Sequence, residues 1–425
     1  AGTGRMLRHF TGRGGNVDDC HMTGPSSILV IGTMDTKAAE VRFLRDRIAT
    51  AGARPLVIDV STSGGAGGEA EVTAREVARH HPEGPDAVFS NDRGDAVAAM
   101  SVALRNYIGT IDLAGAIGIG GSGGTAMIAP ALRGVRLGIP KILVSTVASG
   151  NTSPYVDTSD LVLFPSVTDI GGLNRISIPI LTNAAAAITG MVTASRDMRG
   201  DERHAIGLTM FGVTTPCVTA VADRLSSKYD PIVFHATGIG GRAMEELAEQ
   251  GFLQGIADLT TTELCDRLIG GVMPAGPDRI DRLAGLGLPY VGSAGALDMI
   301  NFGSPDTVPD KYADRLFYKH NPQITLMRTT SSECRRIGSE IAKSLNRFKG
   351  PSVFLIPERG VSALDSEGQP FHDPDADAAL FMAVEENVRQ TERRRVIRLP
   401  YHINDTAFAM VAAHELENMM HGVGA

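Results

Sequence analysis

A glycine-rich segment at 118–125 contains the residue types best suited to anion binding. The apolar run 113–119 predicts a buried strand, and 126–132 predicts the helix after it. Glycine lets a ligand approach the main chain closely, and a helix N-terminus presents free N–H groups and a positive dipole end. A phosphate or carboxylate site is therefore predicted at a turn formed by Gly120, Gly121, Ser122, Gly123, Gly124 and Thr125.

The tetrapeptide Gly-Ile-Gly-Gly occurs at 118–121 and again at 238–241, each time between an apolar run and a helical pattern. The second turn makes Gly238, Gly240 and Gly241 candidates for the same kind of contact. Two halves with one such turn each predict two similar α/β domains that face each other across a ligand cleft. The alternative is that these small residues only allow helix and strand to pack closely.

The segment 31–37, IGTMDTK, follows the first β-type run and opens a helix. Gly32, Thr33, Asp35 and Lys37 are candidate ligand contacts in this loop. Lys37 would lie in the first helical turn, where the helix dipole disfavours a cation unless an anion also binds there. The spacing is not that of a Walker A loop.

Two carboxylates in the second half, Glu263 and Asp266, are three residues apart. On a helix they would share one face, where they could hold Mg²⁺ or act as acid and base. Asp35 is a third candidate ligand for the same metal. A solvated helix face is the alternative interpretation of the pair.

Further candidates follow predicted strands, where open α/β sheets bind their ligands. His235 and His320 are candidate general bases, and Arg328 and Arg359 are candidate clamps for a carboxylate. Ser122 also satisfies the pattern Gly-x-Ser-x-Gly of a hydrolase nucleophile. Phosphate turns are equally rich in glycine and no triad partner is identifiable, so we favour the phosphate interpretation.

Composition excludes several classes of function. The formal net charge is −8, the chain contains no Trp, and few residues are aromatic, which argues against a nucleic-acid surface. The four cysteines lack paired spacing, which favours a reducing, cytoplasmic location. The uncharged stretches 113–132 and 176–195 are interrupted by glycine or by proline and polar residues, so we expect buried elements and no membrane span.

The chain divides into three parts by composition. Residues 1–22 are rich in Gly, Arg and His and are expected to form a disordered leader. Residues 23–197 and 198–425 each alternate β-type runs with helical patterns, and the charged stretch 196–203 lies at their boundary. The predicted fold is α/β, with two Rossmann-like, doubly wound subdomains and a ligand cleft between them.

Six motifs together resemble one family, the ATP-binding N-terminal domain of the tomato mosaic virus resistance protein and its uncharacterised microbial relatives. They are IGTMDTK (31–37), IGGSGGT (119–125), FHATGIGGRAME (234–245), TTELCD (261–266), KHNPQITLMRTT (319–330) and PERGVSALD (357–365). The resemblance implies two Rossmann-like subdomains, binding of ATP with Mg²⁺, and a homodimer. It places nucleotide contacts on 32–37 and 120–125, and less firmly on 238–241, but supplies no reaction.

Three hypotheses about function follow. The first is a protein that binds ATP and Mg²⁺ in the cleft between its domains. The second is a metabolic enzyme, of hydrolase or lyase type, whose substrate is an anionic small molecule such as a sugar acid or a phosphorylated metabolite. The third is a non-catalytic module in which ATP locks the two domains together for a partner.

Overall fold

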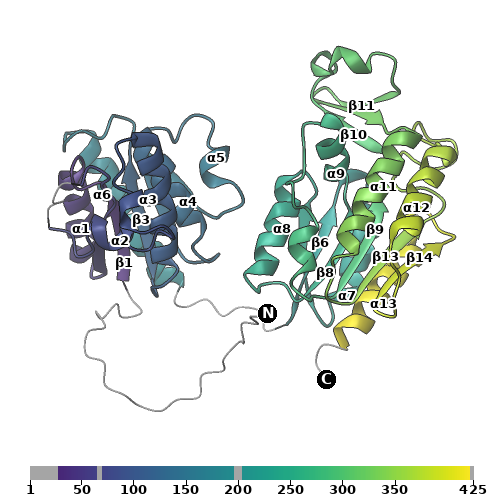
Figure 1. The fold of residues 1–425 in the computed structure, drawn as a ribbon, viewed down its shortest axis with the longest axis horizontal. Helices are drawn as coiled ribbons and strands as arrows, with labels where there is room; N and C mark the ends of the chain where they lie inside the picture. The colour runs from purple at the N-terminus through teal and green to yellow at the C-terminus, as the bar shows by residue number, and fades with distance from the viewer. Residues whose placement is uncertain (1–26, 65–68, 196–202, 422–425) are drawn as a thin grey trace, which may run out of the picture. The chain divides into compact units, whose positions relative to one another are not determined.

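A computed structural model describes residues 27–64, 69–195 and 203–421. The chain forms two compact units: the first contains the chain up to Val156 together with Asp160–Asp197, and the second contains Asp157–Ser159 and Met198 onward (Figure 1). The predicted leader, residues 1–22, and nearly all of the predicted boundary segment lie outside the described residues.

The first unit is built on a parallel five-stranded sheet in the order β2-β1-β3-β4-β5. Its central strands are buried along their whole length, as is usual where helices cover both faces of a parallel sheet, and this explains their continuous apolar runs. The strands are β1 (Ser27–Gly32), β2 (Arg54–Asp59), β3 (Gly115–Gly120), β4 (Lys141–Ser145) and β5 (Val162–Pro165).

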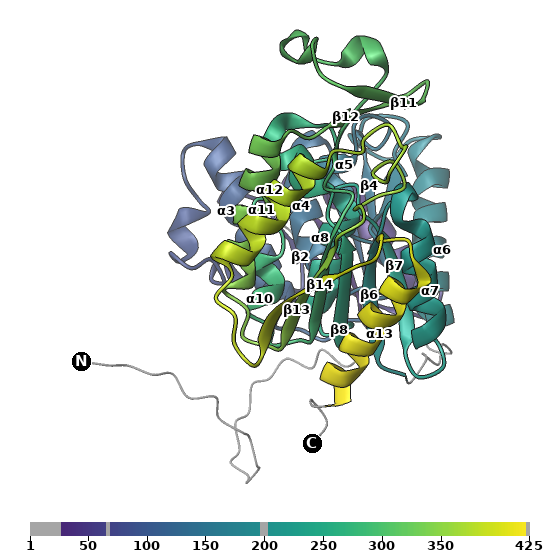
Figure 2. The same cartoon turned by 90° about the vertical axis from the view of Figure 1, so that its right-hand side faces the viewer.

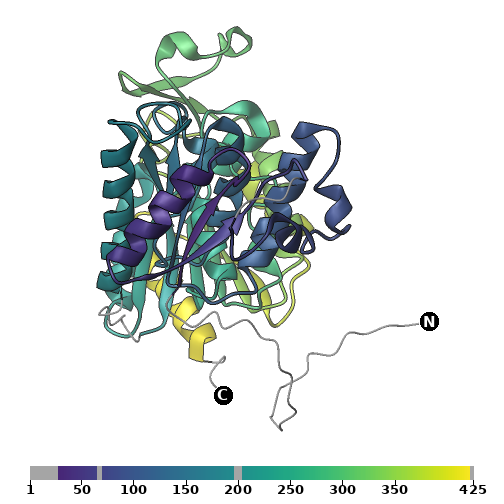
Figure 3. The same ribbon diagram turned by 90° about the vertical axis from the view of Figure 1, so that its left-hand side faces the viewer.

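Helices cover both faces of this sheet. Helices α1 (Ala38–Thr50) and α6 (Ser177–Ser195) pack on one face through a core that contains Val41 and Ile188. Helices α2 (Ala74–Ala78), α3 (Arg93–Ile108) and α4 (Ser122–Arg133) pack on the other face (Figure 3). The short elements are η1 (Pro85–Ala87) and α5 (Ser153–Val156). The unit is therefore doubly wound, as predicted.

The second unit has a parallel six-stranded sheet in the order β14-β13-β9-β8-β6-β7. One face carries α7 (Thr215–Leu225) and α13 (Thr406–His421); the other carries α8 (Ile239–Glu249), α10 (Asp281–Ala284), α11 (Ser331–Leu345) and α12 (Pro374–Asn387) (Figure 2). The strands are β6 (Ala205–Met210), β7 (Asp230–His235), β8 (Gly255–Thr260), β9 (Tyr290–Gly295), β13 (Ser352–Pro357) and β14 (Arg394–Leu399). The prediction of two α/β subdomains is thus confirmed.

A small antiparallel sheet, not predicted from the sequence, covers the carboxyl edge of the larger sheet in the second unit. It consists of β10 (Met299–Phe302), β12 (Ile324–Arg328) and β11 (Phe317–Asn321), and it lies at one end of the unit (Figure 1). Met299 and Leu326 pack there against Phe211, Ala296 and Phe371, which follow strands of the larger sheet or lie in its loops. The edge where α/β sheets usually bind ligands is therefore filled by an apolar cluster.

Helix α6 corresponds to one of the two uncharged stretches in the sequence. Its segment Ser177–Ala194 has the length and composition of a membrane-crossing helix, with a mean hydropathy of 1.3, and a third of it is buried in the unit. Leu181, Ala184 and Ile188 pack into the core formed with α1. The other stretch forms β3 and most of α4 and contains no such helix.

Candidate functional site

The first unit has its topological switch point between β1 and β3. These two strands are neighbours, and the chain continues from β1 to β2 on one side and to β3 on the other. A cavity of about 590 Å³ lies at their carboxyl ends. Loops after all five strands contribute to its wall, through Thr33, Thr62, Gly121, Thr146 and Asp169. Ligands of open α/β sheets bind at this position.

The β3–α4 turn presents unused N–H donors to the cavity. Gly121 is the N-cap of α4, and no side chain caps the helix there. The amide of Thr125 donates to the carbonyl of Gly121 over 2.8 Å. In the described part of the chain, the amides of Ser122, Gly123 and Gly124 have no acceptor. An anion at this turn would satisfy these donors and meet the positive end of the helix dipole.

The glycines of this turn differ in why the protein needs them. A Cβ on Gly120 would lie 2.7 Å from the carbonyl carbon of Gly124, so close packing of strand and helix requires glycine there. A Cβ on Gly121, Gly123 or Gly124 would meet nothing closer than 3.6 Å, and none of these three has a positive φ. Neither packing nor backbone conformation therefore requires glycine at these three positions. A ligand that contacts the main chain would require it.

Two cations line the same cavity, Lys37 and Arg93. Lys37 is the N-cap residue of α1, and Arg93 is the first residue of α3. The Arg93 guanidinium lies beside the glycine turn, with one Nη 3.6 Å from the Cβ position of Gly123. Arg93 was not predicted, although it is also a cation at a helix start, the criterion that selected Lys37.

The β1–α1 loop contributes side chains rather than amides. The amide of Met34 donates to the buried Asp59 carboxylate at 3.0 Å, and the amide of Asp35 donates to the Ser61 hydroxyl at 3.1 Å. The amide of Lys37 donates to the carbonyl of Thr33. The loop can therefore offer a ligand the side chains of Asp35 and Lys37, but these three amides are already used.

Two predicted contact residues instead support the fold. A Cβ on Gly32 would lie 2.6 Å from a methyl group of Val41, so this glycine allows α1 to pack on β1. Thr125 is fully buried, and its hydroxyl lies 2.6 Å from that of Ser145. Ser122 does line the cavity, but no histidine is present among the described lining residues. These lining residues therefore form no Ser-His-Asp triad with Ser122, which favours the anion-binding interpretation.

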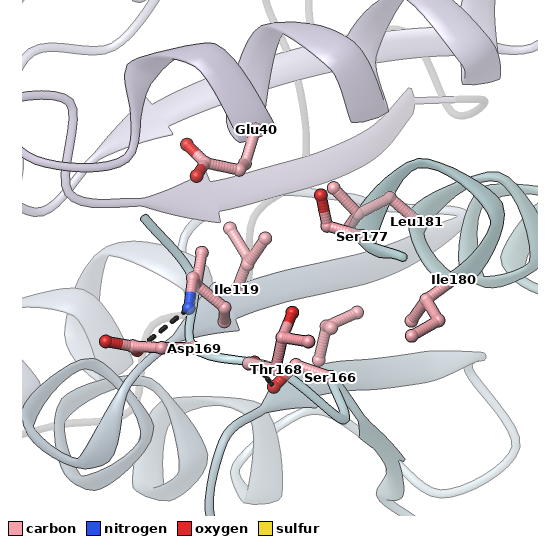
Figure 4. A pocket seen from close by; sticks show the side chains of 10 residues that line it. Glu40, Ile119, Ser166, Thr168, Asp169, Ser177, Ile180 and Leu181 are labelled. Carbon is pink, nitrogen blue, oxygen red and sulfur yellow. Dashed lines mark hydrogen bonds between the residues drawn. The ribbon is translucent and has the colours of Figure 1, made fainter. Parts of the chain in front are cut away.

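The loop after β5 forms another part of the cavity wall. The amide of Thr168 donates to the carbonyl of Ser166 at 2.7 Å, which closes a γ-turn around Val167. Val167 has a φ of 64°, and such turns are rare and strained, above all at a β-branched residue. Beyond the turn, Asp169 lines both the large cavity and a small one of about 10 Å³ beneath Glu40 (Figure 4).

The second glycine turn, in the other unit, is occupied by a side chain of the protein. Gly238 donates its N–H to the Glu263 carboxylate at 2.6 Å. A Cβ on Gly241 would lie 1.9 Å from the same carboxylate, and a Cβ on Gly240 would lie 1.9 Å from the carbonyl oxygen of His235. Gly238, Gly240 and Gly241 thus have packing roles here, as in the alternative interpretation of the sequence. Glu263 takes the place of an external anion.

Arg279, which was not predicted, holds Glu263 in this position. Its guanidinium contacts the carboxylates of Glu263, Asp258 and Glu245 at 2.5, 2.7 and 3.2 Å, and all four side chains are fully buried. Three acids surround one cation, and burial raises the pKa of Glu245 to about 7.

Asp266 lies in a different environment from Glu263. It begins the π-helix η3 (Asp266–Gly270) and accepts hydrogen bonds from the amides of Met273 and Asn301, each at 2.8 Å. Burial raises its pKa to about 7. In the described residues no group of three or more His, Cys, Asp or Glu side chains is placed to hold a metal ion. The structure places Glu263 and Asp266 in buried positions, each with its own protein partners, and metal binding by this pair stays a prediction.

The remaining predicted residues of the second unit do not converge on one site. His235 and His320 are both exposed. The ring of His235 stacks on that of Phe211, with the ring centroids 5.4 Å apart, and His320 lies on β11. Arg328 is buried and donates to the Asp377 carboxylate at 2.8 Å and to the carbonyl of Phe371 at 2.7 Å. Arg359 is exposed after β13. A ligand shared between the two units, with Arg359 as its clamp, stays a prediction.

Comparisons with known proteins agree with the two-unit architecture. Residues 26–197 match the N-terminal domain model, and 203–420 the C-terminal domain model, of an uncharacterised protein family, UPF0261. A UPF0261 protein of Mesorhizobium japonicum is 55% identical over 93% of this chain and 99% of its own length. The ToMV resistance protein Tm-1(GCR237) of Solanum lycopersicum is 43% identical over 90% of this chain, which spans 54% of that protein.

Among solved structures, an acetyl-coenzyme A synthetase 1 from Ca. Korarchaeum cryptofilum aligns over 94% of this chain and 98% of its own, with 10% identity. The TM-score of 0.15 is too low to support an argument. The assignment of this chain to a family therefore rests on the two family models and on the sequence relatives. The chain belongs to the UPF0261 family, and it is similar to about half of the tomato resistance protein.

Proposed function

We propose that the first unit binds a phosphate-bearing ligand at the β1/β3 switch point, and that ATP with Mg²⁺ is the first candidate. The observation that carries this proposal is the trio Gly121, Gly123 and Gly124, which the protein itself does not require. The three donors of the turn, the Lys37 ammonium and the Arg93 guanidinium all lie at one cavity. This combination suits a multiply charged phosphate chain.

Asp35 supports the magnesium part of the proposal. Its exposed side chain lines the cavity, two residues before the cation Lys37 in the same loop. A carboxylate beside an anion site is unfavourable unless a cation lies between them, and Mg²⁺ in nucleotide sites is held by one or two carboxylates together with ligand phosphates. Asp35 would thus hold the ion, and Lys37 would neutralise the remaining phosphate charge.

A phosphorylated metabolite is the second candidate ligand. Hydroxyl and amide side chains supply much of the cavity wall outside the glycine turn, and this favours a ligand rich in hydroxyl groups. The described lining residues include no histidine, so acid–base chemistry in the cavity would depend on Asp35, Asp169 or Lys37. The hypothesis of an ATP-locked module requires no such chemistry.

Isothermal titration of the full chain tests the proposal. ATP with Mg²⁺, ATP with EDTA, and inorganic phosphate are titrated in turn, and each is expected to give a saturable signal with one site per chain. Mg²⁺ should strengthen ATP binding in the parent and lose this effect in Asp35→Asn. The absence of heat and of a thermal shift with all three at millimolar concentration would refute a phosphate site.

A further inference from the structure

The cavity of the first unit is lined by more than the glycine turn and its two cations, Lys37 and Arg93. Thr62, Ser63 and Asn91 also line it. Within residues 27–64, 69–195 and 203–421, the side-chain polar atoms of these three have no protein partner. Unpaired hydroxyl and amide groups at a concave surface are suited to recognise the hydroxyl groups of a ligand.

The described lining residues offer no aromatic ring on which a nucleobase could stack. The apolar part of the wall consists of Ala96, Val97 and Met127. Stacking of a base on an aromatic ring contributes about 1–3 kcal/mol in proteins that bind bases. A cavity without such a ring gains little from the base itself.

Asp169 supplies an acceptor at the same cavity. Its Oδ1 accepts a 2.8 Å hydrogen bond from the amide of Ile170, which fixes the carboxylate and leaves the second oxygen unused by that bond. The strained γ-turn at Val167 directs the chain into this position. A carboxylate near the end of a strand is the group that accepts hydrogen bonds from ribose hydroxyls in nucleotide-binding α/β folds.

We infer that the cavity recognises the ribose-phosphate part of its ligand through the β3–α4 turn and Asp169, and does not discriminate between bases. This inference rests on the proposed function. The recognised chemistry is a phosphorylated pentose, which occurs both in nucleotides and in free sugar phosphates. In either case the phosphate lies on the β3–α4 turn and the sugar diol faces Asp169.

A panel of ligands on the full chain in the presence of Mg²⁺ tests this inference. ATP, GTP, CTP and UTP should bind with dissociation constants within about threefold of one another. A tenfold difference would require about 1.4 kcal/mol, and a base without a stacking partner contributes less binding free energy than that. 2′,3′-Dideoxy-ATP, which lacks the diol, should bind about tenfold more weakly than ATP. Ribose 5-phosphate should bind more tightly than inorganic phosphate, and its affinity relative to AMP distinguishes a sugar-phosphate site from a nucleotide site.

The variant Asp169→Asn separates sugar recognition from phosphate and metal binding. It keeps the acceptor for Ile170 but replaces the outer oxygen by an amide donor and removes a negative charge. The preference for ATP over dideoxy-ATP should fall from about tenfold toward one, while inorganic phosphate binds equally well or more tightly. Glu83→Gln, at an exposed acid outside the cavity wall, is the matched control and should retain the full preference.

Three outcomes would overturn the inference. They are a preference of more than tenfold for one base, equal binding of ATP and dideoxy-ATP by the parent, and an Asp169→Asn variant that loses affinity equally for every ligand. In each of these cases phosphate still binds and the proposed function stands. If neither ATP nor phosphate binds the parent, the proposed function itself fails.

Discussion

The carboxylate of Glu263 accepts a 2.6 Å hydrogen bond from the backbone N–H of Gly238, inside the second of two turns with the same tetrapeptide sequence. The first turn has no such internal partner among the described residues, and its amides line a cavity instead. One turn is thus satisfied by the protein itself, and the other keeps free donors among the described residues. This difference assigns the proposed phosphate site to the first unit.

Replacing Glu263 by Gln should destabilise the second unit without affecting ligand binding by the first. The amide removes a charge that faces Arg279, but Asp258 and Glu245 still pair with that guanidinium. The loss in free energy of unfolding should therefore be about 1–3 kcal/mol, less than for an isolated buried pair. Urea unfolding measures the loss, and titration with ATP measures binding.

Glu249→Gln is the matched control for this variant, because Glu249 pairs with Arg282 at a partly exposed position. Its cost should be below about 1 kcal/mol. A Glu263→Gln variant as stable as the parent would show that the carboxylate does not hold the turn. Loss of ATP affinity together with unchanged stability would instead indicate that Glu263 contacts the ligand.

Stability should fall as the pH rises from 6 to 8. Burial raises the pKa values of Glu245 and Asp266 to about 7, and it also raises that of Asp298, which lies beside Asp365. The folded state therefore binds more protons than the unfolded state between about pH 4 and 7, and this stabilisation is lost as the pH passes 7. The expected loss is about 1 kcal/mol for each group that titrates near 7.

Urea unfolding of the full chain at pH 6, 7 and 8 measures this effect. In the Glu245→Gln variant the free energy of unfolding should decline less between pH 6 and 8. The difference should equal the contribution of one titrating group, because glutamine does not titrate. Stability that rises over this interval, or an identical pH profile in parent and variant, would contradict the raised pKa of this buried acid.

Glycine at position 167 should leave the protein equally stable or more stable by about 1 kcal/mol. Val167 has a φ of 64°, and its side chain is 78% exposed, so the substitution relieves strain and loses little buried surface. Val162→Gly is the control. Val162 lies on β5 and its φ is not positive, so its replacement by glycine should lower the free energy of unfolding by about 1 kcal/mol. Thermal unfolding compares the two variants, and a destabilised Val167→Gly would refute strain at this turn.

Arg93→Ala should weaken binding of ATP and of inorganic phosphate about ten- to a hundredfold, because a charge-assisted hydrogen bond contributes about 1.5–3 kcal/mol. The difference from the parent should shrink as the salt concentration rises, since Arg93 is exposed. Arg45→Ala, at a surface arginine that pairs with Asp46, is the control and should bind as the parent does. An Arg93→Ala variant with parental affinity would remove this cation from the site.

The fold could be predicted from the sequence because buried parallel strands produce continuous apolar runs and because glycine turns mark strand-to-helix junctions. The first glycine turn and Lys37 were expected from the same features, and both line the cavity of the first unit. Their contact with a ligand stays a prediction. The small sheet over the second unit was not, because β10, β11 and β12 pair antiparallel over loops rather than in the α/β pattern.

The role of the second turn could not be predicted either. Its sequence matches that of the first, and the difference lies in Glu263, which is 25 positions further along the chain from Gly238. Spacing placed Glu263 and Asp266 together, but each is buried with its own partners. Only the packing of the segment after β8, which contains Glu263, against the turn before α8 shows which turn is already filled.

Substituting one glycine in each turn tests the central claim most directly, with stability and ATP binding measured on the same samples. Gly123→Ala should leave the free energy of unfolding unchanged or raise it by up to about 1 kcal/mol, because alanine favours the helix. It should weaken ATP binding by at least tenfold, because the methyl group occupies the approach of the phosphate. Gly241→Ala should destabilise the protein, because its Cβ would lie 1.9 Å from Glu263. A Gly123→Ala variant that binds ATP as tightly as the parent, or a Gly241→Ala variant that is stable but no longer binds it, would contradict the account.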